Sequence, residues 1–137
     1  MVPVGQPLVL KGAALALADG ISTSDVSRLA AETAVKSFLD DYYCTSDAWS
    51  ARTAATRVIS AANSWLHAQN DPDLPQDRGH VCTFDAIVFK GRRAHIFHVG
   101  DARIWRISGD TLEQLTTDHR IQVSEGTSYL ARAIGLG

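Results

Sequence analysis

The chain has 137 residues, of which 45% are hydrophobic and 20% are charged, a composition typical of one soluble globular domain with a buried core. A net charge of −2 and a pI near 6.2 give no electrostatic reason to expect nucleic acid or an anionic membrane surface as a partner. No apolar run approaches the roughly 20 residues of a membrane span, and the N-terminus lacks the pattern of a signal peptide. We therefore expect a cytoplasmic protein.

An apolar stretch near the N-terminus predicts a strand that ends in an acidic corner. Residues 13–18, preceded by the apolar residues 8–10, are of strand length, and we interpret them as a strand buried on both faces. Asp19 is the first charge after this strand, and Gly20 gives the chain room to turn. A carboxylate in this position has a rigid support and an open front, which suits a ligand of a divalent metal ion. The competing interpretation is an ordinary Asp-Gly turn.

Two long amphipathic helices are predicted to follow. Apolar side chains recur at four-residue steps over residues 24–43, which predicts a helix capped by one of the hydroxyl residues 22–24. After a break at residues 45–47, a second helix is predicted over about residues 48–69, with Trp65 in its buried stripe. We expect the two helices to pack side by side over one face of a sheet.

The C-terminal half has the character of β-structure. Residues 81–89 and 94–99 predict a hairpin, and residues 103–107 and 111–115 predict a second one. These successive short strands indicate an antiparallel meander. Residues 128–134 are expected to form a short helix or a docking segment.

Two corners combine an aspartate with a glycine at the end of an apolar strand. They are Asp19-Gly20 and Gly100-Asp101. If the two strands are neighbours, the carboxylates converge on one end of the sheet. Hard oxygen ligands of this kind select Mg²⁺, Mn²⁺ or Ca²⁺.

The other candidate residues argue against zinc and against cysteine chemistry. His95 and His98 are three residues apart on a strand, so they face opposite sides and cannot chelate one ion together. We interpret each of the five histidines as a surface residue or a hydrogen-bonded core residue. Cys44 and Cys82 match no zinc spacing, and we expect two reduced thiols rather than a disulfide.

The order of these parts resembles the metal-dependent protein phosphatases of type 2C, particularly the bacterial branch that is often fused to Ser/Thr kinase domains. The resemblance runs from about residue 8 to the end of the chain. Two departures are Ile21, where the family usually continues with glycine, and Ala102, where serine is usual. The matching segments are Leu15-Ala16-Leu17-Ala18-Asp19-Gly20, His98-Val99-Gly100-Asp101-Ala102-Arg103, Leu115-Thr116-Thr117-Asp118-His119 and Arg132-Ala133-Ile134-Gly135.

The resemblance implies a fold and a chemistry. The implied fold is α+β, an antiparallel β-sandwich with pairs of long helices on its outer faces. The implied reaction is hydrolysis of phosphoserine and phosphothreonine by a water that two Mn²⁺ or Mg²⁺ ions activate. By resemblance, Asp19 bridges both ions, Gly20 offers its backbone carbonyl to one of them, and Asp101 helps to hold a third, weaker ion.

Several of the family's acidic ligands have no counterpart in this sequence, because the first strand and the last third of the domain are not matched. We therefore expect residues 1–137 to be a single partial phosphatase-like domain, truncated at both ends, whose activity alone is an open question. The implied partners are a phosphoprotein substrate, a Ser/Thr kinase domain on the same polypeptide, and a second copy that covers exposed sheet edges. The alternatives are a non-catalytic interaction or regulatory module that keeps the scaffold, and an unrelated α+β ligand-binding domain.

Overall fold

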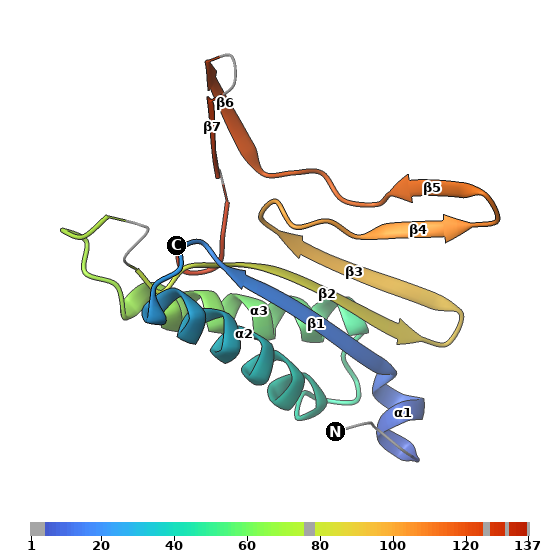
Figure 1. The fold of residues 1–137 in the computed structure, drawn as a ribbon. Helices are drawn as coiled ribbons and strands as arrows, with labels where there is room; N and C mark the ends of the chain where they lie inside the picture. The colour runs from blue at the N-terminus through green and yellow to red at the C-terminus, as the bar shows by residue number, and fades with distance from the viewer. Residues whose placement is uncertain (1–4, 76–78, 125–126, 131, 137) are drawn as a thin grey trace.

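The computed structural model describes residues 5–75, 79–124, 127–130 and 132–136, and it consists of three helices and seven strands within these ranges (Figure 1). The expected α+β class with antiparallel sheets is confirmed. The elements are α1 (Gln6–Lys11), β1 (Ala13–Gly20), α2 (Asp25–Tyr43), α3 (Ala51–Ala68), β2 (Cys82–Lys90), β3 (Arg93–Val99), β4 (Trp105–Ser108), β5 (Thr111–Gln114), β6 (Arg120–Ser124) and β7 (Thr127–Leu130).

The main sheet has three antiparallel strands in the order β1-β2-β3, and α2 and α3 lie side by side against one face of it (Figure 1). The predicted hairpin of β2 and β3 is confirmed, as is the predicted packing of the helix pair. Two further hairpins, β4-β5 and β6-β7, form separate two-stranded ladders. The expected meander therefore continues along the chain as separate hairpins rather than as one sheet.

The first strand is covered on one face only, so the expectation that it is buried on both faces is wrong. Ala14, Ala16 and Ala18 pack against the core under the helices. Leu15 and Leu17 point to the other face and are 61% and 64% exposed. Successive side chains of a strand point to opposite faces, and in the described structure the helix layer covers only the face that carries the alanines of β1. Residues 8–10 do not extend the strand, since they belong to α1.

The two long helices begin at serine caps. The Ser24 side chain accepts a hydrogen bond from the backbone N–H of Ser27, as predicted for the first helix. The second helix begins at Ala51 with Ser50 as its cap, later than expected. The hydroxyl of Thr45, in the predicted break, is not available as a cap because it donates to the carbonyl of Tyr42 and accepts from Lys11 Nζ.

Trp65 is 54% exposed, so the prediction that it lies in the core is wrong. Its neighbour Leu66 is fully buried instead. Adjacent residues on a helix point about 100° apart, so only one of the two can face the centre of the interface. Aromatic side chains of α2 and β2 form part of the core, where Phe38 lies 5.8 Å from Tyr42 and 5.3 Å from Phe84 between ring centroids.

The segment 128–134 forms neither a helix nor a simple tail. Residues up to Leu130 belong to strand β7, and residue 131 lies outside the described part of the chain. Ile134 then docks beside the start of β2, where its backbone N–H and carbonyl both bond to Cys82, at 2.8 and 3.1 Å. The expected docking segment is therefore present, but only at Ile134 and its neighbours, which are buried.

Candidate functional site

The two aspartate-glycine corners lie at the same end of the main sheet, because β1 and β3 both flank β2. Thr83 lies between them. The backbone N–H of Asp19 donates to Thr83 Oγ1 at 3.2 Å, and Thr83 is the register partner of Asp19. Gly100 packs against the other side of the same threonine, with a φ of +118° that favours glycine. A Cβ at position 100 would lie 2.7 Å from Thr83 Cγ2. The two corners thus lie at one end of the sheet, although β2 separates their strands, and the convergence of the two carboxylates on a shared ion stays a prediction.

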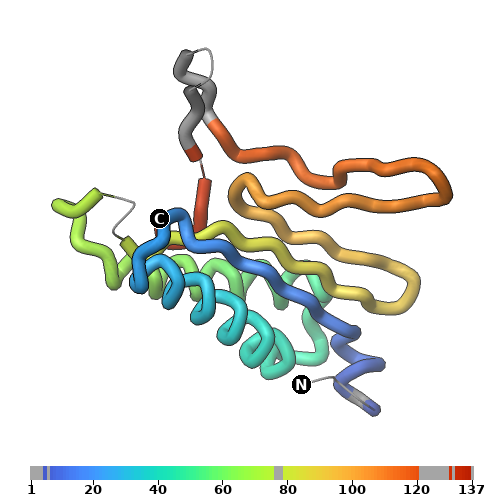
Figure 2. Tube along the Cα trace, in the orientation of Figure 1, coloured from blue at the N-terminus to red at the C-terminus, as the bar shows by residue number. Residues whose placement is uncertain are grey.

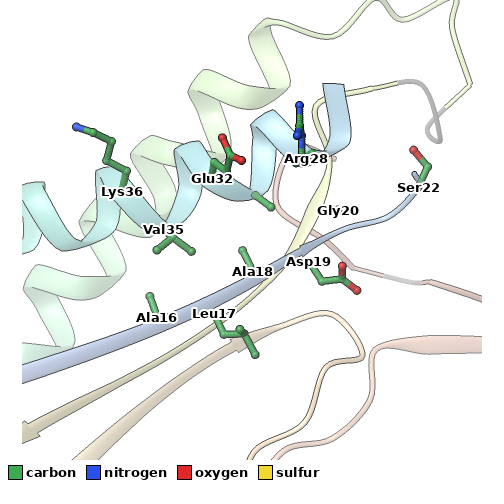
Figure 3. Close-up of a pocket in the computed structure, with 11 residues that line it drawn as sticks. Ala16, Leu17, Ala18, Asp19, Gly20, Ser22, Arg28, Glu32, Val35 and Lys36 are labelled. Carbon is green, nitrogen blue, oxygen red and sulfur yellow. The ribbon is translucent and has the colours of Figure 1, made fainter. Parts of the chain in front are cut away.

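Asp19 is exposed on the face of the sheet that the helices leave open. Figure 3 shows Asp19 and Leu17 directed away from α2, whereas Ala16 and Ala18 are directed toward it. Gly20 cannot carry a side chain, because a Cβ there would lie 2.7 Å from the carbonyl oxygen of Ser27 at the start of α2. The close approach of the helix thus requires the glycine, and it fixes the backbone that presents the Asp19 carboxylate.

Asp101 has a different environment. Its carboxylate forms an ion pair with the guanidinium of Arg120, the first residue of β6. A second ion pair lies close by, where Arg103 contacts Asp118 through two nitrogens, with 2.6 Å between Arg103 Nη2 and Asp118 Oδ2. This bond to Arg103 lowers the pKa of Asp118. Both carboxylates at this corner are therefore paired with arginine.

A buried histidine-aspartate pair supports the second corner. His98 Nδ1 lies 2.5 Å from Asp85 Oδ1, and His98 Nε2 lies 2.9 Å from the carbonyl oxygen of Thr117. A carbonyl only accepts, so Nε2 carries a proton and donates it to Thr117. One further proton is then shared between Nδ1 and the Asp85 carboxyl group. Asp85 is 4% exposed, and its Oδ2 has no hydrogen-bond partner among the described residues.

His119 completes this network. Its backbone N–H donates to the carbonyl of Gly100 at 2.9 Å, and its Nδ1 accepts from the backbone N–H of Gly100 at 3.0 Å. The rings of His98 and His119 lie 4.8 Å apart between centroids. Burial lowers the pKa of His119, and the positive charges of His98 and Arg132 lower it further. Figure 2 shows the loop after β3 and the segment before β6 side by side at this point.

The pair of Asp85 and His98 is not predicted by the sequence patterns, in which Asp85 is part of an apolar strand and His98 is one of five histidines. The signal was a single charged residue, Asp85, within the largely apolar residues 81–89, because a buried carboxylate requires a partner. The prediction that each histidine is a surface residue or a hydrogen-bonded core residue holds for His98 and His119.

Both cysteines are free, as expected. Cys44 is exposed on the C-terminal side of α2, and Cys82 is fully buried at the start of β2. Burial, with a smaller contribution from the charge of Asp19, raises the pKa of the Cys82 thiol to about 12. A thiol with such a pKa is not a nucleophile at neutral pH.

The described residues do not form a complete metal site by themselves. Among them, no group of three or more histidine, cysteine, aspartate and glutamate side chains is placed to hold an ion. Asp19 and Gly20 offer one carboxylate and one backbone carbonyl, and one carboxylate is a poor match for two mutually repelling dications. The chemistry of the donor set suits Mn²⁺ or Mg²⁺, but the number of donors does not suit a pair of ions.

A groove of about 700 Å³ runs between the free edge of β1 and α2 (Figure 3). Ala18 and Val35 form part of its apolar lining, and Arg28 and Glu32 lie on its α2 side. Strand β1 pairs only with β2 in the described sheet, so its other edge faces this groove. In the part of the chain that the structure describes, no helix has both the length and the apolar character needed to cross a bilayer.

Comparison with known proteins places this arrangement in a family. Residues 9–134 match protein phosphatase 2C. The chain is 34% identical over 108 residues to the serine/threonine protein phosphatase PstP of Mycobacterium tuberculosis, a match that covers 76% of this chain and 20% of PstP.

Solved structures agree in fold. The PPM Ser-Thr phosphatase MsPP of Mycobacterium smegmatis, solved in complex with cacodylate, superposes with a TM-score of 0.70 at 22% identity, covering 90% of this chain and 57% of MsPP. The crystal structure of PstP from M. tuberculosis gives a TM-score of 0.64 at 26% identity, covering 88% of this chain and 48% of that structure. The chain thus spans about half the length of these solved relatives. On the match over residues 9–134, the chain belongs to the protein phosphatase 2C family.

Proposed function

We propose that this chain is a partial domain of a metal-dependent protein phosphatase that hydrolyses phosphoserine and phosphothreonine. The proposal depends on one observation: in this chain, which belongs to the family, the end of strand β1 holds the exposed Asp19 carboxylate in a fixed position. Asp19 and the Gly20 carbonyl are the proposed ligands of Mn²⁺ or Mg²⁺, and the remaining ligands come from outside the described residues. The ions would supply an activated water. Phosphoprotein substrates, a Ser/Thr kinase domain on the same polypeptide and a cytoplasmic location belong to the same proposal.

Metal binding by this chain gives the first test. A calorimetric Mn²⁺ titration compares the parent chain with Asp19→Asn, and Asp25→Asn is the matched control because Asp25 is an exposed aspartate on α2. We expect binding that Asp19→Asn weakens at least tenfold and that Asp25→Asn leaves unchanged. Equal isotherms for all three proteins would contradict the assignment of Asp19.

Activity gives the second test. The longer polypeptide that contains this chain is assayed with a phosphothreonine peptide in Mn²⁺, with Asp19→Asn as its inactive counterpart. Failure of the parent polypeptide to release phosphate would support the alternative, a non-catalytic module that keeps the scaffold. The alternative is favoured by two observations: within the described ranges no cluster of three metal-binding side chains is formed, and Asp101 is already paired with Arg120.

We also propose that the 137-residue chain associates with a second copy of itself. Leu15, Leu17 and Phe89 are 61%, 64% and 49% exposed on the open face of the sheet, and β1 has a free edge beside the groove. A second copy would remove this apolar surface and this strand edge from water. Static light scattering should show a dimer or larger species, and a monomer at high concentration would contradict the proposal.

A matched pair of variants locates the interface. Leu17→Glu places a charge on the open face and should shift the chain to monomer. Leu29→Glu places the same charge at a leucine of α2 that is 52% exposed, and it should leave association unchanged. Equal effects of the two variants would exclude the open face as the interface.

A further inference from the structure

The ion pair of Asp101 and Arg120 is held in place by its neighbours in the chain. Two hydrogen bonds of 2.9 and 3.0 Å join Gly100 to His119. Asp101 directly follows Gly100 in the chain, and Arg120 directly follows His119. The two side chains therefore start from backbone positions that are fixed relative to each other. Their exposed fractions are 31% for Asp101 and 37% for Arg120, so the pair is partly shielded from water.

Two arginine-carboxylate ion pairs lie at this corner. Asp118 is paired with Arg103, and Asp101 is paired with Arg120. Asp19, on the other side of Thr83, forms no ion pair with any residue in the described ranges. The two aspartates that the family pattern suggests as metal ligands thus differ. One carboxylate faces solvent, and the other already has a cation.

We propose that Arg120 is a tethered counter-cation for Asp101, so that a divalent ion can occupy Asp101 only by displacing the guanidinium. A guanidinium stays protonated at every accessible pH and holds a carboxylate through directed N–H bonds. While it is bound, it occupies carboxylate lone pairs and repels a dication. Arg120 therefore takes the electrostatic place of the third, weaker ion. The inference rests on the proposed function only in the choice of Mn²⁺ as the competing ion.

Removing the guanidinium tests the proposal. Mn²⁺ binding to the 137-residue chain is measured by the loss of the free-ion electron paramagnetic resonance signal and by calorimetry. Arg120→Gln should bind Mn²⁺ at a site that the parent lacks, or at least threefold more tightly. The double variant Arg120→Gln with Asp101→Asn should lose this gain. In the parent background, Asp101→Asn should leave the binding curve unchanged.

The matched control is Arg106→Gln, which removes another arginine-carboxylate pair on the β4-β5 hairpin, with Glu113 as the partner. It should not change Mn²⁺ binding. Arg120→Lys keeps the charge without the planar fork, so it should give a smaller gain than glutamine. If circular dichroism shows that Arg120→Gln does not fold, the Mn²⁺ affinity of Arg120→Lys is compared with that of the parent instead.

Two results would overturn the proposal. One is a parent chain that already loses Mn²⁺ binding in Asp101→Asn, because Asp101 would then be a ligand despite Arg120. The other is an unchanged binding curve for both Arg120 variants. These outcomes are separate from the proposed function, which depends on Asp19→Asn. The proposal for Arg120 can fail even if Asp19 binds metal. It can also hold if Asp19 does not bind metal.

Discussion

The two faces of the main sheet are built from similar strands but are covered differently. On the helix face, the small side chains of Ala14, Ala16 and Ala18 let α2 approach closely, and the exposed fraction of Phe84 is only 2%. On the open face, Leu15 and Leu17 are larger and yet more than half exposed. Large apolar side chains on an uncovered face indicate a surface at which another protein layer binds.

The difference between the two faces also explains why the Asp19 carboxylate is exposed. Asp19 lies on the open face, in line with Leu15 and Leu17. One patch of that face is covered, at the second corner, where the segment carrying Thr117 and His119 lies over His98. The covered corner has its polar groups paired, whereas the uncovered corner leaves its carboxylate exposed. The proposed metal ligand Asp19 would therefore need a further layer on this face to supply its partner ligands.

The largest loss of stability is expected from removing one partner of the buried pair of Asp85 and His98. His98→Ala removes the partner of a carboxyl group that is 4% exposed, so it should reduce the free energy of unfolding by about 3–5 kcal/mol. Replacing both partners, Asp85→Leu with His98→Leu, should cost much less, because no unpaired polar group stays buried. Urea unfolding measures both. A double variant as unstable as the single one would show that the pair itself stabilises the fold.

The same leucine change on the two faces should differ strongly in effect. Leu66 is fully buried under the helices, so Leu66→Ala should reduce stability by about 2–5 kcal/mol through lost burial and a cavity. Leu17→Ala on the open face should change stability by less than about 0.5 kcal/mol. Urea unfolding at low protein concentration, where association does not contribute, makes this comparison. Equal losses would mean that the open face is covered in solution.

Glycines at the covered corner and in an open turn should also differ. Gly100→Ala meets both a positive φ and a contact of 2.7 Å with Thr83, so a loss of about 1–3 kcal/mol is expected from the backbone alone, with the clash adding to it. Gly91 has a φ of +61° but open space around it, and Gly91→Ala should cost only about 1 kcal/mol. Thermal unfolding of the two variants measures the difference, and a similar loss in both would exclude tight packing at Thr83.

The smallest expected effect is a pH dependence from His119. Its pKa is lowered in the folded chain from the ordinary value of 6.5, mainly by burial, so the unfolded chain binds more protons below about pH 6.5. This contribution to stability is complete above that pH and is lost as the pH falls toward the folded pKa. His119→Gln should flatten the dependence between pH 6.5 and 5 in urea unfolding. An unchanged slope would show that His119 takes up its proton without cost.

Local sequence patterns determined most of the elements. The strand that leads into Asp19, the helix capped at Ser24 and the β2-β3 hairpin are all predicted by the sequence, because each depends on periodicity and turn chemistry within a few residues. The resemblance of the segment around Asp101 and of the following segment 115–119 to known motifs also identified the family.

Only the tertiary structure decided which groups are covered and paired. The alternation of alanine and leucine along β1 could not show which face stays open, because both residues are apolar. The pairs of Asp85 with His98 and of Asp101 with Arg120 join residues that are 13 and 19 positions apart. Such contacts depend on strand register and on how separate segments pack at one end of the sheet. Local propensity carries no information about either, and this is why the state of the Asp101 carboxylate could not be predicted from the sequence.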